Sequence, residues 1–302
     1  MIEENGGYTA TCSILDYTPG AFNSGTLFNV TLKAKNQSIG TVGMPGSGTD
    51  VLLSDIILRD PLNHPIEYIS QDGDIIIEPP LYIYTGIKVF LQGPYIMGTG
   101  GTMTHVLIDI NRLPLTSPYD PTLTLTAFPN VAPRLIVDWI YVQLRTTSTG
   151  AFEQPQSCFL LNDGTVVDLT GSHLLTFNYT GAIQYYTVVR HRNHLGVMSA
   201  TRSVFSTDPL ETTINDLTVL NSVYGGNYFG IKEIEPGILA LYSGDADQNK
   251  VIAPMDINNY YRPQSGLLYG YYSADFNLDS NVTPIDQNNY CRPNTGRLSQ
   301  IP

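Results

Sequence analysis

The stretch Asp245-Ala-Asp-Gln-Asn-Lys-Val-Ile-Ala-Pro-Met-Asp256 returns 30 residues later as Asp275-Phe-Asn-Leu-Asp-Ser-Asn-Val-Thr-Pro-Ile-Asp286. Over the 22 positions from Asp245 to Gly266, nine residues are identical at this offset, where chance gives roughly one. The sequence therefore contains a tandem duplication, and its two copies determine how this part of the chain folds.

Both copies place oxygen-bearing side chains at loop positions 1, 3, 5 and 12. These are Asp245, Asp247, Asn249 and Asp256 in the first loop, and Asp275, Asn277, Asp279 and Asp286 in the second. Such alternation surrounds a hard cation with oxygen, and a backbone carbonyl at position 7, from Val251 or Asn281, completes the set. The sequence thus predicts two calcium ions. The alternative, two Asx-rich turns without metal, does not require oxygens at the same four positions twice.

Proline at position 10 of each copy suits the first turn of a helix, because its missing N–H has no intrahelical partner there. We expect each helix to run for about eight residues and to end before the Arg262-Pro263 or Arg292-Pro293 dipeptide. We also expect the apolar residues at position 8, Ile252 and Val282, to join the two loops through a short strand contact.

The loop, the single exiting helix, aspartate at position 12 and the tandem copy together resemble the dockerin family over about residues 241–299. The resemblance implies a calcium-folded module that docks onto a cohesin partner. Two features depart from the pattern. Lys250 and Ser280 occupy position 6, where a left-handed backbone favours glycine, at a cost of ~1 kcal/mol each. Proline and an apolar residue replace the usual Ser/Thr pair at positions 10 and 11, so the partner contact need not follow the usual dockerin pattern.

The composition favours a mainly β, globular protein. The 302 residues are 42% hydrophobic and include 20 tyrosines, with many glycines and prolines that suit strands and turns. A net charge of −12 argues against nucleic acid or an anionic membrane as partner. The three cysteines have no CxxC spacing, which predicts neither a disulfide framework nor a zinc site. No stretch has the length of a membrane span.

Residues 1–79 are predicted to form a first, incomplete β-sandwich. Alternating hydrophobicity in Leu27–Ala34 indicates a half-buried strand, and further strands are expected at 51–58 and 74–78. The succession Gly25–Lys35, Leu53–Pro61 and Asp72–Ile77 resembles the C-terminal half of cohesin-like domains. Such a sandwich needs about 100 residues. The missing strands therefore come either from sequence upstream of Met1 or from another chain.

Residues 80–206 are predicted to form a second sandwich, 207–240 a connector, and 241–302 the small α-helical calcium module. The strands expected in the second sandwich are Thr85–Gly93, Thr102–Ile108, Leu135–Arg145, Phe159–Leu161, Tyr185–Arg192 and Met198–Val204. The segment Val188–Ala200 also resembles a module found beside dockerin-like repeats in bacterial cell-surface proteins. That resemblance implies an extracellular or cell-surface location.

Three groups of residues invite a chemical role. His191 and His194 would lie on opposite faces of a strand and share no metal unless the backbone turns at Asn193, so we interpret them as structural. Trp139 lies on the apolar side of an alternating strand pattern, which predicts a core residue. Stacking on carbohydrate is the alternative. The nine tyrosines between Tyr224 and Tyr290 either form an exposed interface or pack between the two loop-helix units. No catalytic fingerprint is present, so we predict no enzymatic activity.

These features lead to a hypothesis of a secreted, calcium-dependent structural protein. In it, the half-sandwich of one copy receives the calcium module of the next, because a head-to-tail contact between unlike surfaces propagates into an open filament or layer. The alternative is an adhesion or carbohydrate-binding subunit whose calcium module anchors it to a separate cohesin-bearing scaffold.

Overall fold

The computed structural model describes residues 2–4, 7–9, 49–51, 73–75, 82–210, 213–226 and 229–302. Its contacts divide the chain into two compact units, Met1–Pro79 and Pro80–Pro302. The division falls at the end of the first predicted domain. Among the described residues, no helix combines the length and apolar character needed to cross a bilayer.

The described residues of the first unit form two pairs of short antiparallel strands. Strand β1 (Ile2–Glu4) pairs with β2 (Gly7–Thr9), and β3 (Thr49–Val51) pairs with β4 (Gly73–Ile75). The predicted strand at Leu27–Ala34 lies outside the described residues, as does most of the cohesin-like half-sandwich. That part of the prediction remains open.

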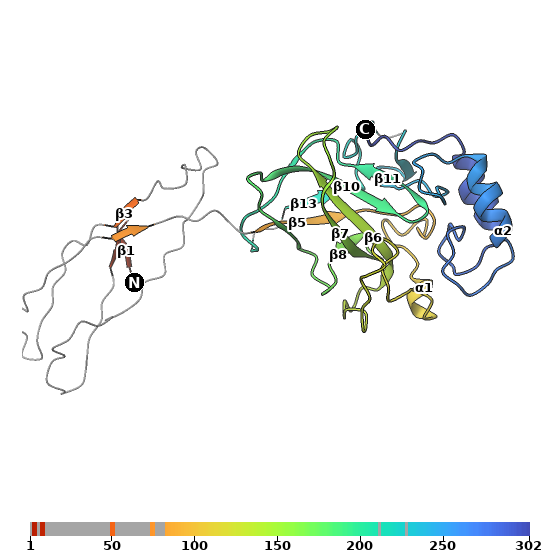
Figure 1. Ribbon diagram of the computed structural model, residues 1–302, viewed down its shortest axis with the longest axis horizontal. Helices are drawn as coiled ribbons and strands as arrows, with labels where there is room; N and C mark the ends of the chain where they lie inside the picture. Colours follow the sequence, from red (N-terminus) through yellow and green to blue (C-terminus); the bar gives the residue numbers. More distant parts are fainter. Residues whose placement is uncertain are drawn as a thin grey trace, which may run out of the picture. The chain divides into compact units, whose positions relative to one another are not determined.

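The second unit is built on a nine-stranded sheet (Figure 1). Its strands are β5 (Tyr82–Lys88), β6 (Ile136–Arg145), β7 (Glu153–Leu161), β8 (Thr165–Val167), β9 (Leu175–Asn178), β10 (Gln184–His191), β11 (His194–Met198), β12 (Ser203–Val204) and β13 (Ile214–Asp216). The hydrogen-bonded order is β11-β10-β6-β7-β8-β5-β13, with β12 on β10 and β9 on β5. The prediction of a mainly β protein is confirmed. The nine strands β5 to β13 form one curled sheet, and the later strands of this unit form a separate two-stranded sheet.

The core of the sheet lies around Trp139, which is fully buried and packs against Phe159 with ring centroids 4.2 Å apart. The Trp139 indole N–H donates to the Pro114 carbonyl at 2.8 Å. This confirms Trp139 as a core residue and leaves it no exposed face for a sugar. Asp138, the preceding residue, points to the opposite face of β6 and is also fully buried.

Two segments differ from their predicted structure. The expected strand at Thr102–Ile108 is wrong, because α1 (Val106–Asp109) begins within it after an isolated bridge at Met103. The connector prediction for 207–240 is also wrong. Strand β13 pairs in parallel with β5, and β14 (Lys232–Glu235) forms a hairpin with β15 (Ile238–Ala240).

Each calcium-type loop leads into a helix, as predicted. The first helix contains η1 (Asp256–Tyr261) and α2 (Arg262–Gln264), and the second contains η2 (Asp286–Cys291) and η3 (Arg292–Asn294). The predicted end before Arg-Pro is wrong, since both helices continue past the proline. The η1 and η2 turns are π-helical, and this wider turn relieves the clash between a proline ring and the carbonyl four residues earlier.

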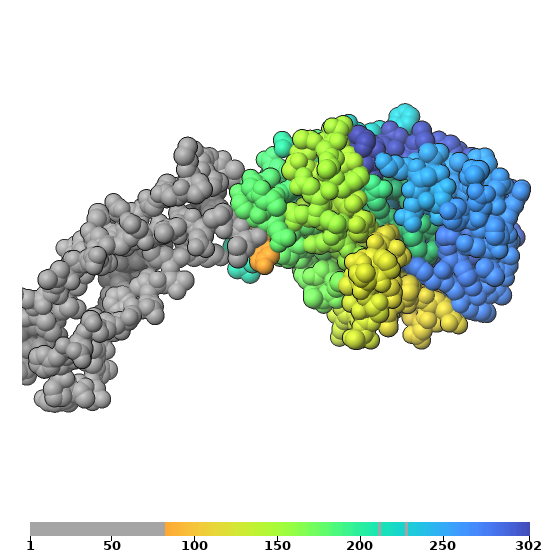
Figure 2. All heavy atoms as spheres, in the orientation of Figure 1, coloured from red at the N-terminus to blue at the C-terminus, as the bar shows by residue number. Residues whose placement is uncertain are grey.

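The loop-helix units and the sheet share one interior, so no boundary separates them near residue 240. Leu195 of β11 packs in the same buried cluster as Ile252, Phe276 and Val282 of the loops. Figure 2 shows the C-terminal residues (blue) lying directly against residues of the sheet (green). Tyr261 is buried and Tyr260 and Tyr290 pack on this cluster, so these three tyrosines serve the packing of the repeat.

Candidate metal centre

The two loops have the same backbone conformation at their strained positions. Lys250 and Ser280, at position 6, have φ values of 77° and 73°, as expected from the loop pattern. Position 4 is also left-handed in both copies, with φ of 56° at Gln248 and 59° at Leu278, which the sequence did not reveal. Four non-glycine residues thus hold a conformation that costs roughly 1–2 kcal/mol per residue. The surrounding loop contacts must stabilise it.

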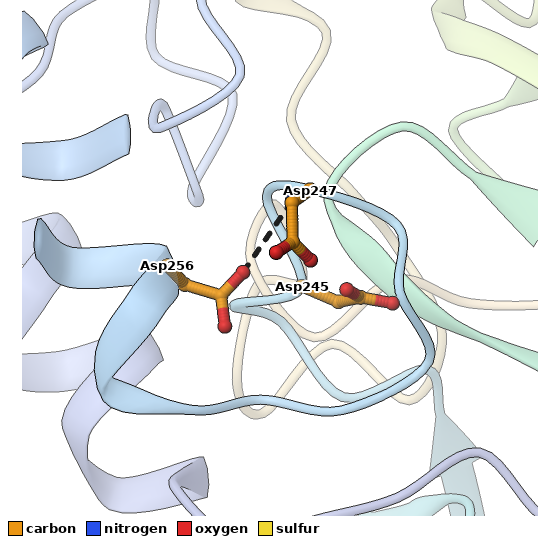
Figure 3. Close-up of side chains that lie close together, drawn as sticks. All are labelled: Asp245, Asp247 and Asp256. Carbon is orange, nitrogen blue, oxygen red and sulfur yellow. Dashed lines mark hydrogen bonds between the residues drawn. The ribbon is translucent and has the colours of Figure 1, made fainter. Parts of the chain in front are cut away.

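Three carboxylates converge in the first loop (Figure 3). Asp245, Asp247 and Asp256 each offer an oxygen, and these oxygens lie within 4.8 Å of one another. Asp256 Oδ1 accepts the backbone N–H groups of Ala246 at 2.8 Å and Asp247 at 3.4 Å, and its Oδ2 accepts that of Ala253 at 2.8 Å. The position-12 aspartate therefore fastens both ends of the loop around the carboxylate cluster.

The Asp245 carboxylate is buried and only partly hydrogen-bonded. Its Oδ1 is buried without a hydrogen-bond partner, while its Oδ2 accepts the Lys250 N–H at 3.3 Å. Burial, reinforced by the charges of Asp256 and Asp247, raises the pKa of Asp245 to about 7. A buried carboxylate oxygen next to two like charges is unfavourable unless a positive charge accompanies it. The residues present therefore fit a hard divalent cation.

The position-5 and position-7 groups are arranged to complete the first loop. Asn249 donates from its amide to Asp247 Oδ2 at 2.8 Å, and its Oδ1 accepts the Val251 N–H at 2.9 Å. The neighbours Lys250 and Ile252 bond to the antiparallel segment 297–299. In such a pair, the intervening residue directs its own N–H and C=O to the opposite side. The Val251 carbonyl is thus turned toward the loop.

The second loop repeats the closure by the position-12 residue. Asp286 Oδ1 accepts the N–H groups of Phe276 at 2.8 Å and Asn277 at 3.3 Å, and its Oδ2 accepts that of Thr283 at 2.9 Å. These donors occupy loop positions 2, 3 and 9, the same three as in the first loop. The duplication therefore preserves the fold of the loop as well as its sequence.

The ligand set of the second loop differs in one exchange. Asn277 replaces an aspartate at position 3, and Asp279 replaces an asparagine at position 5, so the loop still carries three carboxylates. Asn277 donates to Asp279 Oδ2 at 2.9 Å, and Asp279 Oδ1 accepts the Asn281 N–H at 2.9 Å. The Asn281 carbonyl occupies position 7, as Val251 does in the first loop.

Burial is stronger at the start of the second loop. Asp275 is fully buried, and its Oδ2 accepts the Ser280 N–H at 2.8 Å. Burial raises the pKa of Asp275 to about 8 despite the opposing charge of Arg192, and repulsion from Asp286 and Asp279 adds to the effect of burial. Both loops therefore concentrate negative charge in a dry environment, which is favourable only with protons or a cation bound.

The expected strand contact between Ile252 and Val282 takes a different form. Ile252 exchanges backbone hydrogen bonds with Gly296 and Arg297, and Val282 exchanges them with Gly266 and Leu267. Each loop therefore pairs with the segment that follows the helix of the other copy. The duplicated glycines have φ values of 89° at Gly266 and 91° at Gly296, a conformation that favours glycine. The pairing of each loop with the segment after the other copy's helix explains why glycine recurs in both copies.

A buried polar network joins the repeat to the sheet. Asp138 of β6 accepts hydrogen bonds from Arg192 Nε at 2.9 Å and from the Tyr271 hydroxyl at 2.7 Å, and it contacts His191 Nε2 at 3.2 Å. The Arg192 guanidinium also lies 4.0 Å from the Tyr271 ring centroid and donates to the Tyr272 carbonyl. Charge pairing and hydrogen bonds keep the pKa of Asp138 low despite its burial. The network holds the segment that leads into the second loop.

The two histidines belong to this structural network. The backbone turns between β10 and β11, so His191 and His194 meet with their Nδ1 atoms 3.0 Å apart. His194 Nε2 accepts the Gly93 N–H at 3.2 Å. Burial lowers the pKa of both imidazoles, most strongly that of His194, which favours their neutral forms. The structural interpretation of this pair fits their hydrogen bonds.

Asparagines provide two more connections between the repeat and the sheet. The Asn193 amide donates to the Asp275 carbonyl at 2.7 Å, directly beside the second loop. The buried Asn294 amide donates to Gln92 Oε1 and to the Ser243 carbonyl, each at 2.7 Å. These contacts join residues that are 51 to 202 positions apart in sequence. Sequence analysis missed them because no local pattern signals such pairs.

Gly93 marks the closest approach between the sheet and the second loop. A Cβ atom at Gly93 would lie 1.8 Å from the Phe276 carbonyl oxygen. Glycine is therefore required by the close passage of another backbone. Leu278, at position 4 of the same loop, is buried in the main core of the sheet.

Comparison with known proteins gives little further guidance. No protein-family model matches the chain, and no curated protein matches it. Similar solved structures include crystal structures of an N-terminal and a C-terminal interface mutant of a type II cohesin-X-dockerin complex from Acetivibrio cellulolyticus. Their identities are 10% and 9%, and their TM-scores 0.35 and 0.34. Each match covers 72% of this chain and 97% of the matched chain. These values establish no family for this protein.

Proposed function

We propose that this protein is a secreted structural protein whose paired loops bind two calcium ions. In this proposal the calcium-loaded repeat of one copy docks onto residues 1–79 of another, head to tail, and copies build an extracellular filament or surface layer. The observation that carries the proposal is the duplicated loop. Each copy has three carboxylates, which converge in the first loop, and the same pattern of closing hydrogen bonds occurs in both.

The chemistry of the loops supports calcium as the cation. Each loop supplies three carboxylates, an asparagine side chain and a position-7 carbonyl, an all-oxygen set in the spacing of known calcium loops. When calcium is bound, it would neutralise the carboxylates and fix the loop around them. The protein groups would include Asp245, Asp247 and Asp256 in the first loop, and Asp275, Asp279 and Asp286 in the second.

Exposed apolar side chains on the repeat support a docking role. Met255 and Ile285, at position 11 of the two copies, are 52% and 50% exposed. Leu268 and Leu298, a second pair at the 30-residue offset, are 53% and 48% exposed. Large apolar side chains exposed at duplicated positions are typical of surfaces that bind another protein. We refer to these four residues as the docking residues.

Charge supports residues 1–79 of another copy as the occupant. That unit contains 10 acidic and 3 basic residues, a net charge of −7. Residues 241–302 contain 6 acidic and 4 basic residues, a net charge of −2, which two calcium ions would change to +2. Calcium would thus convert repulsion into attraction between the two surfaces. Docking between unlike surfaces at the two ends of the chain propagates unless the rotation closes a ring.

The test compares particle size of the full chain in calcium and in excess chelator, by sedimentation and electron microscopy. We expect long assemblies in calcium and monomers after chelation. The double substitution Met255→Ser with Ile285→Ser should prevent assembly while leaving calcium binding, measured by calorimetry, intact. Assemblies that persist without calcium, or a monomer in saturating calcium, would contradict the proposal.

A further inference from the structure

A second surface feature lies on the sheet, where Tyr141 of β6 lines two neighbouring cavities. The first has a volume of about 380 Å³ and the second about 400 Å³. Tyr141 stacks on Tyr119 with ring centroids 5.0 Å apart and planes at 21°. Both tyrosines are half-buried. We call the two cavities and the tyrosine pair the Tyr141 groove.

The first cavity combines aromatic surface with hydrogen-bonding groups. It is lined by Pro118, Tyr119, Tyr141, Gln143, Phe152, Arg190 and Gln248. Arg190 donates from Nε to Gln143 Oε1 at 3.1 Å, and its guanidinium lies 4.7 Å from the Phe152 ring centroid. These contacts hold the side chain in place and leave its terminal nitrogens to interact with an incoming group.

Arg190 makes no direct ion pair among the described residues, and the charge of Asp245 acts on it only from beyond ion-pair distance. Within the described ranges, no carboxylate lies within ion-pair distance of this guanidinium. Arg145 packs on the same Phe152 ring at 3.9 Å, so two cations share one small region. Burial and the nearby Arg145 lower the pKa of Arg190. A ligand carboxylate would be favoured here, because a guanidinium binds a carboxylate through two parallel hydrogen bonds.

The second cavity offers acceptors and hydroxyl groups. It includes Asp120, Gln156, Ser157, Asp168 and Thr170. One oxygen of Asp120 accepts from Thr122, and one oxygen of Asp168 accepts from Thr170 and Ser172, which holds both carboxylates in position. Two carboxylates held in position near an aromatic ring suit a ligand with many hydroxyl groups.

We propose that the Tyr141 groove binds an acidic glycan, with a sugar carboxylate on Arg190 and a pyranose ring against the Tyr141 side chain. A neighbouring uncharged sugar extends into the second cavity, where its hydroxyls donate to Asp120 and Asp168, whose charges would repel a second sugar carboxylate. Sugars present an apolar ring face and an equatorial rim of hydroxyls, which is the combination that these two cavities match. This activity is separate from assembly and uses none of the docking residues.

The first calcium loop contributes directly to this groove. Gln248, at position 4, lines the first cavity and has a left-handed backbone. Calcium bound in the loop would fix Gln248 over the cavity, so glycan affinity should rise with calcium. This coupling rests on the calcium binding proposed above, whereas the roles of Arg190 and Tyr141 do not.

The test titrates the full chain with hexasaccharides of hyaluronan and of galacturonate, and with cellohexaose as the neutral probe, by calorimetry. Short oligomers at micromolar calcium avoid gelation of the uronates. We expect hyaluronan, whose alternate sugars carry no carboxylate, to bind most tightly, galacturonate to bind more weakly, and cellohexaose to bind at least tenfold more weakly than hyaluronan. Arg190→Gln and Tyr141→Val should each weaken uronate binding by about tenfold or more, Gln248→Ala by about threefold, and Arg112→Gln, an exposed control, not at all.

Each outcome decides a part of the proposal. Absence of uronate binding at millimolar concentration, or equal affinity in wild type and Arg190→Gln with both folded by thermal denaturation, overturns the groove assignment. Equal binding of cellohexaose overturns the role of the carboxylate. If calorimetry shows that the loops bind no calcium and that uronate affinity is the same with and without calcium, the proposed function is contradicted. The assignment of the Tyr141 groove as a glycan site would then still hold.

Discussion

The two copies of the duplicated loop share a backbone but occupy different surroundings. In the first loop, Gln248 and Lys250 are exposed to solvent at positions 4 and 6. In the second, the equivalent Leu278 and Ser280 are buried, with exposed fractions of 1% and 0%. The first loop faces solvent and lines the Tyr141 groove, whereas the second is built into the core of the sheet.

This difference gives the two proposed calcium loops different structural surroundings. The second loop carries Leu278 into the main core, passes its backbone against Gly93, and is held by the Asn193 amide. Its order should therefore depend on the sheet, and that of the sheet on the loop. The first loop also packs Ile252 into a buried cluster with Leu195, but its positions 4 and 6 are exposed to solvent. The two copies carry similar ligand sets, and packing buries positions 4 and 6 of the second loop while leaving those of the first exposed.

The largest effect is expected where the second loop meets the sheet. Gly93→Ala places a Cβ 1.8 Å from the Phe276 carbonyl oxygen, and the nearby atoms are backbone, which cannot rotate away. We expect the free energy of unfolding to fall by about 3 kcal/mol or more. The measurement is chemical denaturation in saturating calcium.

The control for this substitution is Gly86→Ala. The nearest atom to its added Cβ is the Ile214 Cγ1 at 3.3 Å, on a side chain that can adjust. This variant should lose much less stability. Equal stability of Gly93→Ala and the wild type would show that the second loop is not locked to the sheet.

The next effect separates the two metal sites by removing the position-12 carboxylate from each. A bound ligand at 100 times its Kd stabilises the native state by about 2.7 kcal/mol. Asp286→Asn should lower the Tm of the whole second unit, because the second loop shares the core of the sheet. Asp256→Asn should leave the main transition nearly unchanged and speed amide exchange in residues 245–256.

Calorimetry and hydrogen exchange in calcium distinguish these two outcomes. Asp109→Asn, an exposed residue at the end of α1 whose carboxylate pairs with His105 at 2.7 Å, is the surface control. If both variants lower the main transition equally, the structural difference between the loops has no energetic counterpart.

Much of the repeat could be predicted from the sequence. The alternating oxygens, the prolines at position 10 and the duplication located both loops and both helices, because these features act through local backbone geometry. The left-handed conformation at Lys250 and Ser280 also followed from the loop pattern. Calcium binding and head-to-tail assembly remain predictions.

Contacts between distant segments could not be predicted in the same way. The parallel pairing of β13 with β5 joins residues about 130 positions apart, and nothing in the local sequence of 207–240 indicates it. A signal for the different roles of the two loops was present, however. Glutamine and lysine in one copy, against leucine and serine in the other, indicate an exposed and a buried surface. Differences between repeats can thus be as informative as identities.

A pH dependence of opposite sign is expected with and without calcium. Without calcium, the pKa values of Asp245 and Asp275, about 7 and about 8, lie above the value of about 3.9 for an unfolded aspartate. The native state then binds protons more tightly, so its stability falls as pH rises from about 4 to about 8. With calcium saturating, proton release favours the metal, and stability should rise over the same window. Parallel Tm curves in chelator and in calcium would contradict this assignment.

The smallest effect compares position 6 of the two loops. Ser280→Gly removes left-handed strain of about 1 kcal/mol and a buried hydroxyl that has no hydrogen-bond partner. These gains should exceed the roughly 0.5–1 kcal/mol entropy cost of glycine, raising Tm by about 2–4 °C. Lys250→Gly relieves only the strain, because the lysine is exposed, so its Tm should change by less than about 1 °C.

Ser280→Ala separates the two causes, because it deletes the hydroxyl but keeps the Cβ that makes the left-handed backbone unfavourable. Its Tm in saturating calcium should lie between those of the wild type and Ser280→Gly. If alanine and glycine stabilise the protein equally, burial of the hydroxyl alone distinguishes the second loop from the first. If neither raises the Tm, the second loop is no more constrained at position 6 than its exposed copy.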